Sequence, residues 1–180
     1  MKILINFLTY SRIACGPIIF LLVTIFESYG SALLLFFYAS ISDFLDGYFA
    51  RKHKLTSVLG AILDPIADKI LILFLIIALT INLESLYFGF IGSLMLAREF
   101  WVAALRDFNA RNGNQGATEV TFLAKIKTFA QLVALGGYIV ALYLNSALIL
   151  FLSDFLFFGA LIITIQTGVK YSLQSFKKAA

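Results

Sequence analysis

The chain has 180 residues, of which 61% are hydrophobic and 16% aromatic; this composition excludes a soluble domain and favours an all-α membrane protein. Its net charge is +4, but the basic residues flank apolar segments, which excludes nucleic acid as a partner and favours a lipid bilayer with anionic headgroups. One cysteine and one histidine exclude a zinc site built from thiolates and imidazoles.

Six segments are apolar enough to be membrane-spanning helices, since a span needs about 20 mostly apolar residues. In chain order they cover residues 7–27, 31–50, 58–80, 87–108, 121–144 and 147–169. They use nearly the whole chain, which predicts a single membrane domain over residues 1–180 with short loops. Lys and Arg gather at both termini and beside the second and fourth connections, while the other connections lack them. The positive-inside rule therefore predicts a polytopic protein with six transmembrane helices and both termini in the cytoplasm.

Four aspartates interrupt the second and third of these segments. Asp43 and Asp46 are three residues apart, and Asp64 and Asp68 are four apart, so each pair shares a helix face. A short basic loop joins the two segments, so we expect all four carboxylates to converge near the cytoplasmic surface. A charged side chain in mid-bilayer costs roughly 2.5–3.5 kcal/mol, and clustered carboxylates repel one another. Oxygen ligands of this kind favour Mg²⁺ or Mn²⁺, so the cluster predicts a site for one or two divalent cations.

Small residues surround the aspartates. Gly47 and Ala50 follow the first pair by about one helical turn, and Gly60 precedes the second pair by one turn. Small side chains allow helices to approach closely and leave room for a ligand. Arg51 comes directly afterwards and is placed to meet an anionic group. Metal ions, an arginine and open space at a membrane surface together favour phosphoryl transfer on a lipid.

Several cations lie on the cytoplasmic halves of the fourth and fifth segments. They are Arg98, Arg106, Lys125 and Lys127. A phosphorylated acceptor would need such cations, whereas a neutral acceptor would not. Two other interpretations stay open: these residues could only enforce topology, or they could pair with Glu99 and Asp107. A buried network of Arg98 and Glu99 would satisfy both of those charges.

The aspartate region resembles the signature of the CDP-alcohol phosphatidyltransferase family, Asp-x2-Asp-Gly-x2-Ala-Arg-x8-Gly-x3-Asp-x3-Asp. Its fixed positions are filled here by Asp43, Asp46, Gly47, Ala50, Arg51, Gly60, Asp64 and Asp68. Looser similarity in residues 6–17, 97–106 and 125–131 is to the members of this family that use glycerol 3-phosphate as acceptor. The chain departs from the family pattern directly before Asn6, where the usual proline is missing.

The resemblance implies an enzyme of phospholipid biosynthesis that transfers a phosphatidyl group from CDP-diacylglycerol to glycerol 3-phosphate and releases CMP. It implies two divalent cations, Mg²⁺ or Mn²⁺, held by Asp43, Asp46, Asp64 and Asp68, of which Asp68 would also be the catalytic base. It implies nucleotide-binding roles for Asn6, Thr9, Asp43, Gly47, Ala50 and Arg51. It further implies a homodimer. The bacterial cytoplasmic (inner) membrane is the expected location, with an organellar membrane as the open alternative, and the positive-inside rule predicts an active site facing the cytoplasm.

The sequence leaves two alternatives open. A sibling enzyme would use another acceptor, such as phosphatidylglycerol, serine or an inositol phosphate. A cation-coupled or proton-coupled transporter would also carry carboxylates within the membrane. It would place them near the midplane and show a repeat between the two halves, but the last three segments contain no second set of aspartates.

Overall fold

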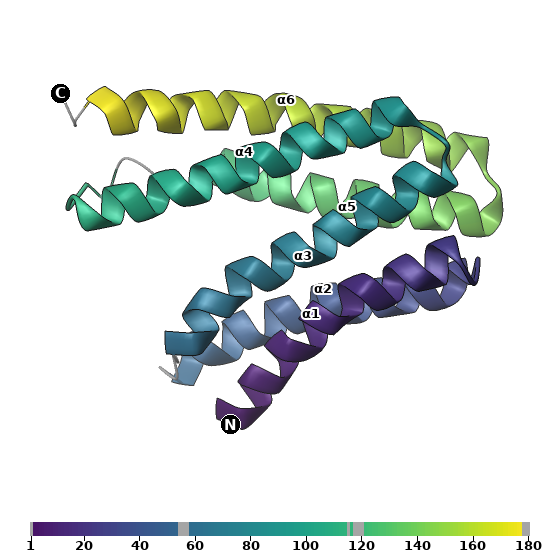
Figure 1. Ribbon diagram of the computed structural model, residues 1–180, viewed down its shortest axis with the longest axis horizontal. Helices are drawn as coiled ribbons and strands as arrows, with labels where there is room; N and C mark the ends of the chain where they lie inside the picture. The colour runs from purple at the N-terminus through teal and green to yellow at the C-terminus, as the bar shows by residue number, and fades with distance from the viewer. Residues whose placement is uncertain (1, 54–57, 115, 117–120, 178–180) are drawn as a thin grey trace. The chain divides into compact units, whose positions relative to one another are not determined.

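The structure of the protein is a computed structural model, which describes residues 2–53, 58–114, 116 and 121–177. The side chains of residues 2–6, 44, 46–53 and 58–62 lie outside this description. All regular secondary structure in the described residues is helical, which confirms the predicted all-α class. The helices, labelled in Figure 1, are α1 Lys2–Thr24, α2 Tyr29–His53, α3 Val58–Asn82, α4 Leu86–Arg111, α5 Phe122–Leu144 and α6 Ala147–Lys177.

Each predicted segment coincides with one helix, but the helix ends differ from the ends of the apolar runs. α1 ends at Thr24 rather than at residue 27, because the chain turns at Glu27, whose φ of 47° is left-handed. α6 continues to Lys177, past the predicted end at residue 169. Residues 170–177 contain neither proline nor glycine, so nothing in the sequence stops the helix where the apolar run ends.

The connections that follow α1, α3 and α5 are tight turns. Each contains one residue with positive φ: Glu27 at 47°, Glu84 at 49° and Asn145 at 49°. A residue with a β-carbon pays roughly 1–2 kcal/mol for this conformation, which glycine adopts freely. Asparagine tolerates it better than glutamate does. The two glutamates are therefore locally unfavourable choices that the surrounding helices impose.

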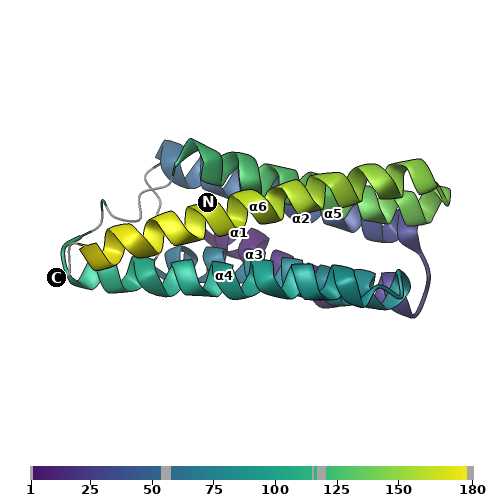
Figure 2. The same cartoon turned by 90° about the horizontal axis from the view of Figure 1, so that it is seen from above.

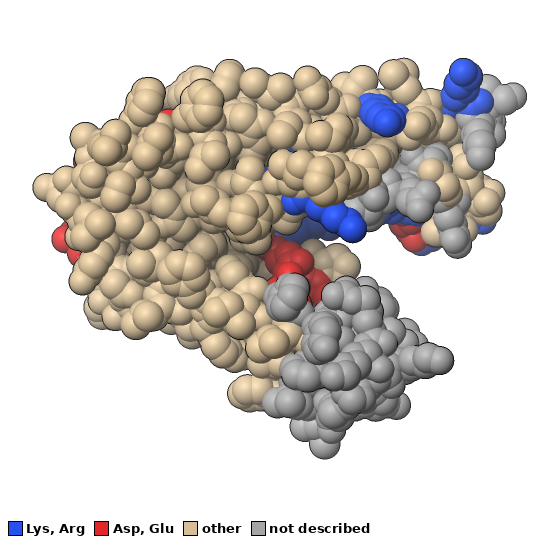
Figure 3. All heavy atoms as spheres, turned by 180° about the vertical axis from the view of Figure 1, so that it is seen from behind, with Lys and Arg blue, Asp and Glu red and all other residues tan. Residues whose placement is uncertain are grey.

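Much of the exposed surface is apolar, as expected for a protein in a lipid environment. By length and composition, four of the described helices can cross a membrane: α4, α5, α6 and the Phe7–Thr24 part of α1. Large apolar side chains such as Leu34, Leu86 and Phe155 are mostly exposed. Figure 3 shows uncharged residues over most of the drawn face. These features indicate an integral membrane protein, while the predicted number of six spans stays a prediction.

The chain divides into two compact units. Unit 1 comprises Met1–Gly89 and Ile139–Asn145, and unit 2 comprises Phe90–Tyr138 and Ser146–Ala180. In unit 1, α1 packs against both α2 and α3 (Figures 1 and 2). Cys15, Ile19 and Val23 recur at four-residue intervals on α1 and are buried. α2 and α3 contribute further apolar side chains to this core, namely Ala32, Phe36, Ala39, Leu71, Leu75 and Leu79.

Helices α1 and α3 approach each other closely at Gly16. A β-carbon added there would lie 3.2 Å from Cδ2 of Phe74 and 3.3 Å from the carbonyl oxygen of Ile70. A small residue at this point lets the two backbones approach, as it does at many helix contacts in membranes. The close contact fixes α1 against α3 about one turn away from Arg12.

A second link in unit 1 is the side-chain amide of Asn82 at the end of α3. Its Nδ2 donates to the carbonyl oxygen of Val23 near the end of α1, at 2.9 Å. Its Oδ1 accepts from the hydroxyl of Tyr29 at the start of α2, at 2.8 Å. One amide therefore binds both helix ends that flank the connection between α1 and α2.

Unit 2 contains α6 and most of α4 and α5, joined by polar contacts between the helices. The hydroxyl of Tyr138 on α5 donates to Oδ1 of Asp154 on α6 at 2.6 Å. The indole Nε1 of Trp101 on α4 donates to Oγ of Ser172 on α6 at 2.9 Å. Hydrogen bonds between helices in a membrane contribute about 0.6 kcal/mol on average, so packing supplies most of the stability.

Candidate functional site

The aspartates of α2 and α3 in unit 1 come together around an arginine from α1. Nη1 of Arg12 donates to Oδ1 of Asp43 at 2.8 Å and to Oδ1 of Asp68 at 2.9 Å. Both carboxylates are thus within hydrogen-bonding distance of the same nitrogen atom, although their residues lie on different helices. The structure therefore brings Asp43 and Asp68 to one place.

Burial differs sharply across this group. The side chain of Arg12 is 0% exposed, whereas those of Asp43 and Asp68 are 49% and 45% exposed. The guanidinium lies beneath the carboxylates, within the packed helices, and the carboxylates remain accessible from outside. A ligand can therefore reach both acids without displacing the core.

The third described aspartate, Asp64, is held by a neutral donor on α1. The hydroxyl of Thr9, one turn before Arg12, donates to Oδ1 of Asp64 at 2.9 Å. Thr9 is only 1% exposed. Its predicted contact with a nucleotide stays a prediction.

Several predicted residues lie outside the described side chains: Asn6 on α1, and Asp46, Gly47, Ala50, Arg51 and Gly60. Among the described residues, no group of three or more His, Cys, Asp or Glu side chains is arranged to hold a metal ion. Asp46 is not included in that statement. The donors that do converge, from Asp43 and Asp68, are carboxylate oxygens that remain partly exposed. Their chemistry fits a hard divalent cation such as Mg²⁺ or Mn²⁺.

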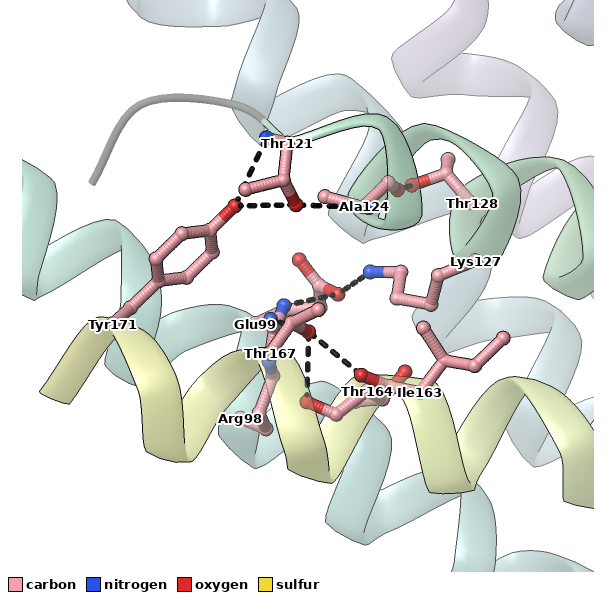
Figure 4. Close-up of polar contacts among 10 residues, drawn as sticks. All are labelled: Arg98, Glu99, Thr121, Ala124, Lys127, Thr128, Ile163, Thr164, Thr167 and Tyr171. Carbon is pink, nitrogen blue, oxygen red and sulfur yellow. Dashed lines mark hydrogen bonds and ion pairs between the residues drawn. The ribbon is translucent and has the colours of Figure 1, made fainter. Parts of the chain in front are cut away.

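Unit 2 contains a second charged group, which Figure 4 shows in close-up. Nη1 of Arg98 donates to Oε1 of Glu99 at 3.2 Å, and the ammonium of Lys127 from α5 forms an ion pair with the same oxygen. The Lys127 side chain is 5% exposed, that of Arg98 is 12% exposed and that of Glu99 is 23% exposed. One carboxylate therefore neutralises one of two largely buried cations, and the group keeps a surplus charge of about one. The Arg98–Glu99 network that the sequence left open is present.

Helix α6 completes the surroundings of Arg98. Nη2 of Arg98 donates to the hydroxyl of Thr167, and the guanidinium carbon of Arg98 lies 6.0 Å from the ring centre of Tyr171. A β-carbon at Gly168 would lie 3.1 Å from both Cγ and Nε of Arg98, so this glycine leaves room for the arginine. Residues of α4 and α6 thus determine where the guanidinium lies.

Two buried nitrogens in or near the Arg98–Glu99–Lys127 group have no hydrogen-bond partner among the described residues. They are Nε of Arg98 and Nε2 of Gln131, which follows Lys127 by one turn of α5. Leaving a buried donor without an acceptor costs about 1–3 kcal/mol. An unsatisfied buried donor in a native structure needs an explanation, and a ligand that accepts its hydrogen bond is one such explanation.

The other two predicted cations, Arg106 and Lys125, are exposed. The sequence left open that they pair with Glu99 or Asp107. The structure gives these acids other partners, because Glu99 binds Arg98 and Lys127, and Asp107 pairs with Arg111 at 2.8 Å. Within the described part of the chain, Arg106 and Lys125 form no ion pair.

The sequence did not identify three residues that shape these groups. Asn6, Thr9 and Arg12 follow one another at three-residue intervals, which puts them on one helix face and was a usable signal for Arg12. A basic residue near the N-terminus is also explained by the positive-inside rule. Thr167 and Tyr171 lie in an apolar helix about 70 residues from Arg98, and no local pattern links them to it.

Comparison with known proteins adds independent information. The family model described as CDP-alcohol phosphatidyltransferase matches residues 2–166. A protein of Rickettsia typhi is 40% identical over 95% of this chain and 96% of its own length, and one of Rickettsia bellii is 41% identical over 92% and 91%. A protein of Haemophilus influenzae is 35% identical over 77% of this chain and 73% of its own length. All three carry the name CDP-diacylglycerol–glycerol-3-phosphate 3-phosphatidyltransferase.

Proposed function

Because the chain belongs to the CDP-alcohol phosphatidyltransferase family, we propose that it transfers the phosphatidyl group of CDP-diacylglycerol to glycerol 3-phosphate, forming phosphatidylglycerophosphate and CMP. The named activity of relatives that match nearly the whole chain supports this choice of substrates. The structural observation that carries the proposal is the convergence of Asp43 and Asp68 from the family signature, with both carboxylates accessible.

Members of this family generally depend on divalent cations. Asp43, Asp46, Asp64 and Asp68 are the residues proposed to hold two such ions, and Mg²⁺ or Mn²⁺ is the expected metal. When bound, the ions supply positive charge that neutralises the diphosphate of CDP-diacylglycerol and stabilises the departing nucleotide phosphate.

In the reaction, Asp68 acts as the general base. Its carboxylate is 45% exposed, so the hydroxyl of an acceptor can reach it. The carboxylate takes the proton of this hydroxyl as its oxygen bonds to the phosphorus that bears diacylglycerol. The bond from that phosphorus to the oxygen bridging it to CMP breaks, and CMP leaves with the electron pair. This direct displacement needs no covalent enzyme intermediate.

The cytidine nucleotide is proposed to bind beside the aspartates, at Asn6, Thr9, Asp43, Gly47, Ala50 and Arg51. The small residues of α2 provide space, and an arginine provides a charge for a phosphate oxygen. Since the hydroxyl of Thr9 donates to Asp64, Thr9 contributes to this site at least by fixing that carboxylate.

The acceptor phosphate is proposed to bind at Arg98, Arg106, Lys125 and Lys127. The surplus charge around Glu99 and the exposure of Arg106 and Lys125 support an anionic ligand. The buried donors of Arg98 and Gln131 that lack partners support it further. These features favour a phosphate ester over serine or another acceptor without a phosphate.

We further propose that the whole chain, residues 1–180, is one membrane domain, because the family match covers parts of both units. Six transmembrane helices, both termini in the cytoplasm and an active site facing the cytoplasm follow from the distribution of Lys and Arg. The bacterial origin of the relatives supports the inner membrane. A homodimer is expected from the family resemblance.

The direct test measures CMP release from CDP-diacylglycerol by purified protein with Mg²⁺ or Mn²⁺, with one acceptor at a time. Glycerol 3-phosphate is expected to stimulate release, whereas phosphatidylglycerol, serine and inositol 1-phosphate are not. Asp68→Asn should abolish turnover, and Asp107→Asn, which alters an exposed ion pair, should retain it. Stimulation by another acceptor would replace the acceptor assignment, and retained activity in Asp68→Asn would overturn the base assignment. Folded protein that releases CMP with none of the four acceptors would favour the transporter alternative.

A further inference from the structure

Arg12 is a completely buried arginine in a membrane helix, and among its described bonding partners are two acids of the proposed metal site. The same nitrogen, Nη1, binds Asp43 of α2 and Asp68 of α3, at 2.8 and 2.9 Å. A buried guanidinium is costly unless it is paired, so these contacts are a requirement of the fold as well as of the site. The bonds also connect the two helices that carry the family signature.

The arrangement controls the direction from which the carboxylates are approached. Arg12 is 0% exposed and contacts the acids from within the helix bundle of unit 1, while Asp43 and Asp68 are each about half exposed. The guanidinium therefore fixes one oxygen of each carboxylate without closing the exposed side. Side chains that support metal ligands in this way, by holding their orientation, are common in metal sites.

Charge gives a second reason for an arginine at this position. Two carboxylates that share one donor repel each other. The fixed positive charge of Arg12 offsets part of this repulsion whether or not an ion is bound. A guanidinium is suited to the task because it stays charged and its donors have a rigid geometry.

Thr9 extends the same support to a third acid. It lies on α1 one turn before Arg12 and donates to Asp64 at 2.9 Å. The close contact of α1 with α3 at Gly16 holds this face of α1 in place. One face of α1 therefore reaches Asp43, Asp64 and Asp68, the three aspartates of the family signature whose side chains the structure describes.

We propose that Arg12 is a positioning residue for divalent-cation binding, which orients Asp43 and Asp68 from beneath and compensates their charge. The inference rests on the proposed function only in assuming that these aspartates bind a divalent cation. It gives Arg12 a role toward the ion through its ligands, distinct from the roles proposed for the nucleotide-binding and acceptor-binding residues.

The test measures the Kd for Mn²⁺ of full-length protein in detergent, by electron paramagnetic resonance of free Mn²⁺, in the absence of substrates. Arg12→Gln should raise this Kd about 10- to 100-fold, the usual effect of losing a side chain that supports metal ligands. Arg12→Lys keeps the charge but lacks the planar fork, so its increase should be smaller than that of Arg12→Gln and still measurable.

Two controls separate positioning from general damage. Ile19→Ala removes a fully buried side chain from α1 and should lower thermal stability while leaving the Kd for Mn²⁺ unchanged. Arg111→Gln removes one positive charge at an exposed site and should also leave it unchanged. If Arg12→Gln does not fold, the increase expected in Arg12→Lys carries the test.

An unchanged or tighter Kd for Mn²⁺ in the Arg12 variants would overturn the inference, because Arg12 would then be neutral or would compete with the ion. An equal increase in Ile19→Ala would overturn it as well, since the effect would be one of general stability. Wild-type protein that binds no Mn²⁺ would instead refute the metal assignment under the proposed function, and this inference with it.

Discussion

Neutralising Glu99 is expected to destabilise unit 2 strongly, because its carboxylate is the shared partner of two largely buried cations. The Lys127 side chain is 5% exposed and that of Arg98 is 12% exposed. Removing one partner of a buried ion pair costs about 3–5 kcal/mol, since the other charge is left unpaired. Glu99 itself is 23% exposed, and a glutamine still accepts one hydrogen bond. We therefore expect Glu99→Gln to lower the free energy of unfolding by about 2–4 kcal/mol.

A matched control lies on the same helix. Asp107→Asn makes the same change from acid to amide, but the Asp107 and Arg111 side chains are 62% and 77% exposed. Exposed pairs at this spacing contribute about 0.3–0.5 kcal/mol, so this variant should be nearly as stable as the wild type. Adding Lys127→Met to Glu99→Gln removes the stranded ammonium and should recover part of the lost stability.

The assay can use the protein's own fluorescence. Trp101, the sole tryptophan of the chain, lies on α4 close to Glu99 and donates to Ser172 of α6. Its emission should therefore report the separation of these helices during thermal or detergent-induced unfolding. If Glu99→Gln lowers the free energy of unfolding as little as Asp107→Asn does, the reasoning is refuted, because Arg98 and Lys127 would then not depend on the Glu99 carboxylate.

Three further predictions concern packing, a turn and the acceptor. Gly16→Ala should lower the free energy of unfolding by about 1–3 kcal/mol, since a β-carbon there would crowd α3. The control Gly159→Ala, where the β-carbon meets nothing within 4 Å, should raise the free energy of unfolding by about 0.5–1 kcal/mol. Equal effects of the two substitutions would contradict the close contact between α1 and α3. Glu84→Gly should raise the free energy of unfolding by up to about 1 kcal/mol, because glycine adopts the left-handed conformation of Glu84 without strain but costs more backbone entropy on folding. A lower melting temperature in this variant would contradict the prediction. In the CMP-release assay, Arg106→Gln should raise the KM for glycerol 3-phosphate about tenfold or more with little change in kcat. The control Arg111→Gln should leave this KM unchanged. If neither variant changes the KM, Arg106 is not part of the acceptor site.

Apolar length predicted where the helices lie but not where they stop. α1 ends at Thr24 because the chain turns at Glu27. Glutamate does not favour this turn conformation, so residue preferences could not predict the end of the helix. The end of α6 at Lys177 lies beyond the apolar run, because a helix can continue after its surface becomes polar. Membrane thickness limits the apolar run, whereas backbone preference and packing limit the helix.

The aspartates were predictable because helical spacing alone puts each pair on one face. Their link to Arg12 was not, since it depends on how α1 lies against α2 and α3. The pairing of Arg98 with Glu99 was foreseeable from adjacency, but the sharing of that carboxylate with Lys127 was not. In both groups the sequence indicated which charges lie within apolar helices, and tertiary packing decided their partners.

The two hydrogen bonds of Asn82 have a practical consequence for engineering. They hold the end of α1 and the start of α2 to the same side chain of α3, so the connection between α1 and α2 is not the sole link between these helix ends among the described residues. A short epitope inserted in residues 25–28 should therefore leave unit 1 assembled. Antibody access to such an epitope, in spheroplasts of known orientation, would reveal on which side of the membrane this end of the helices lies.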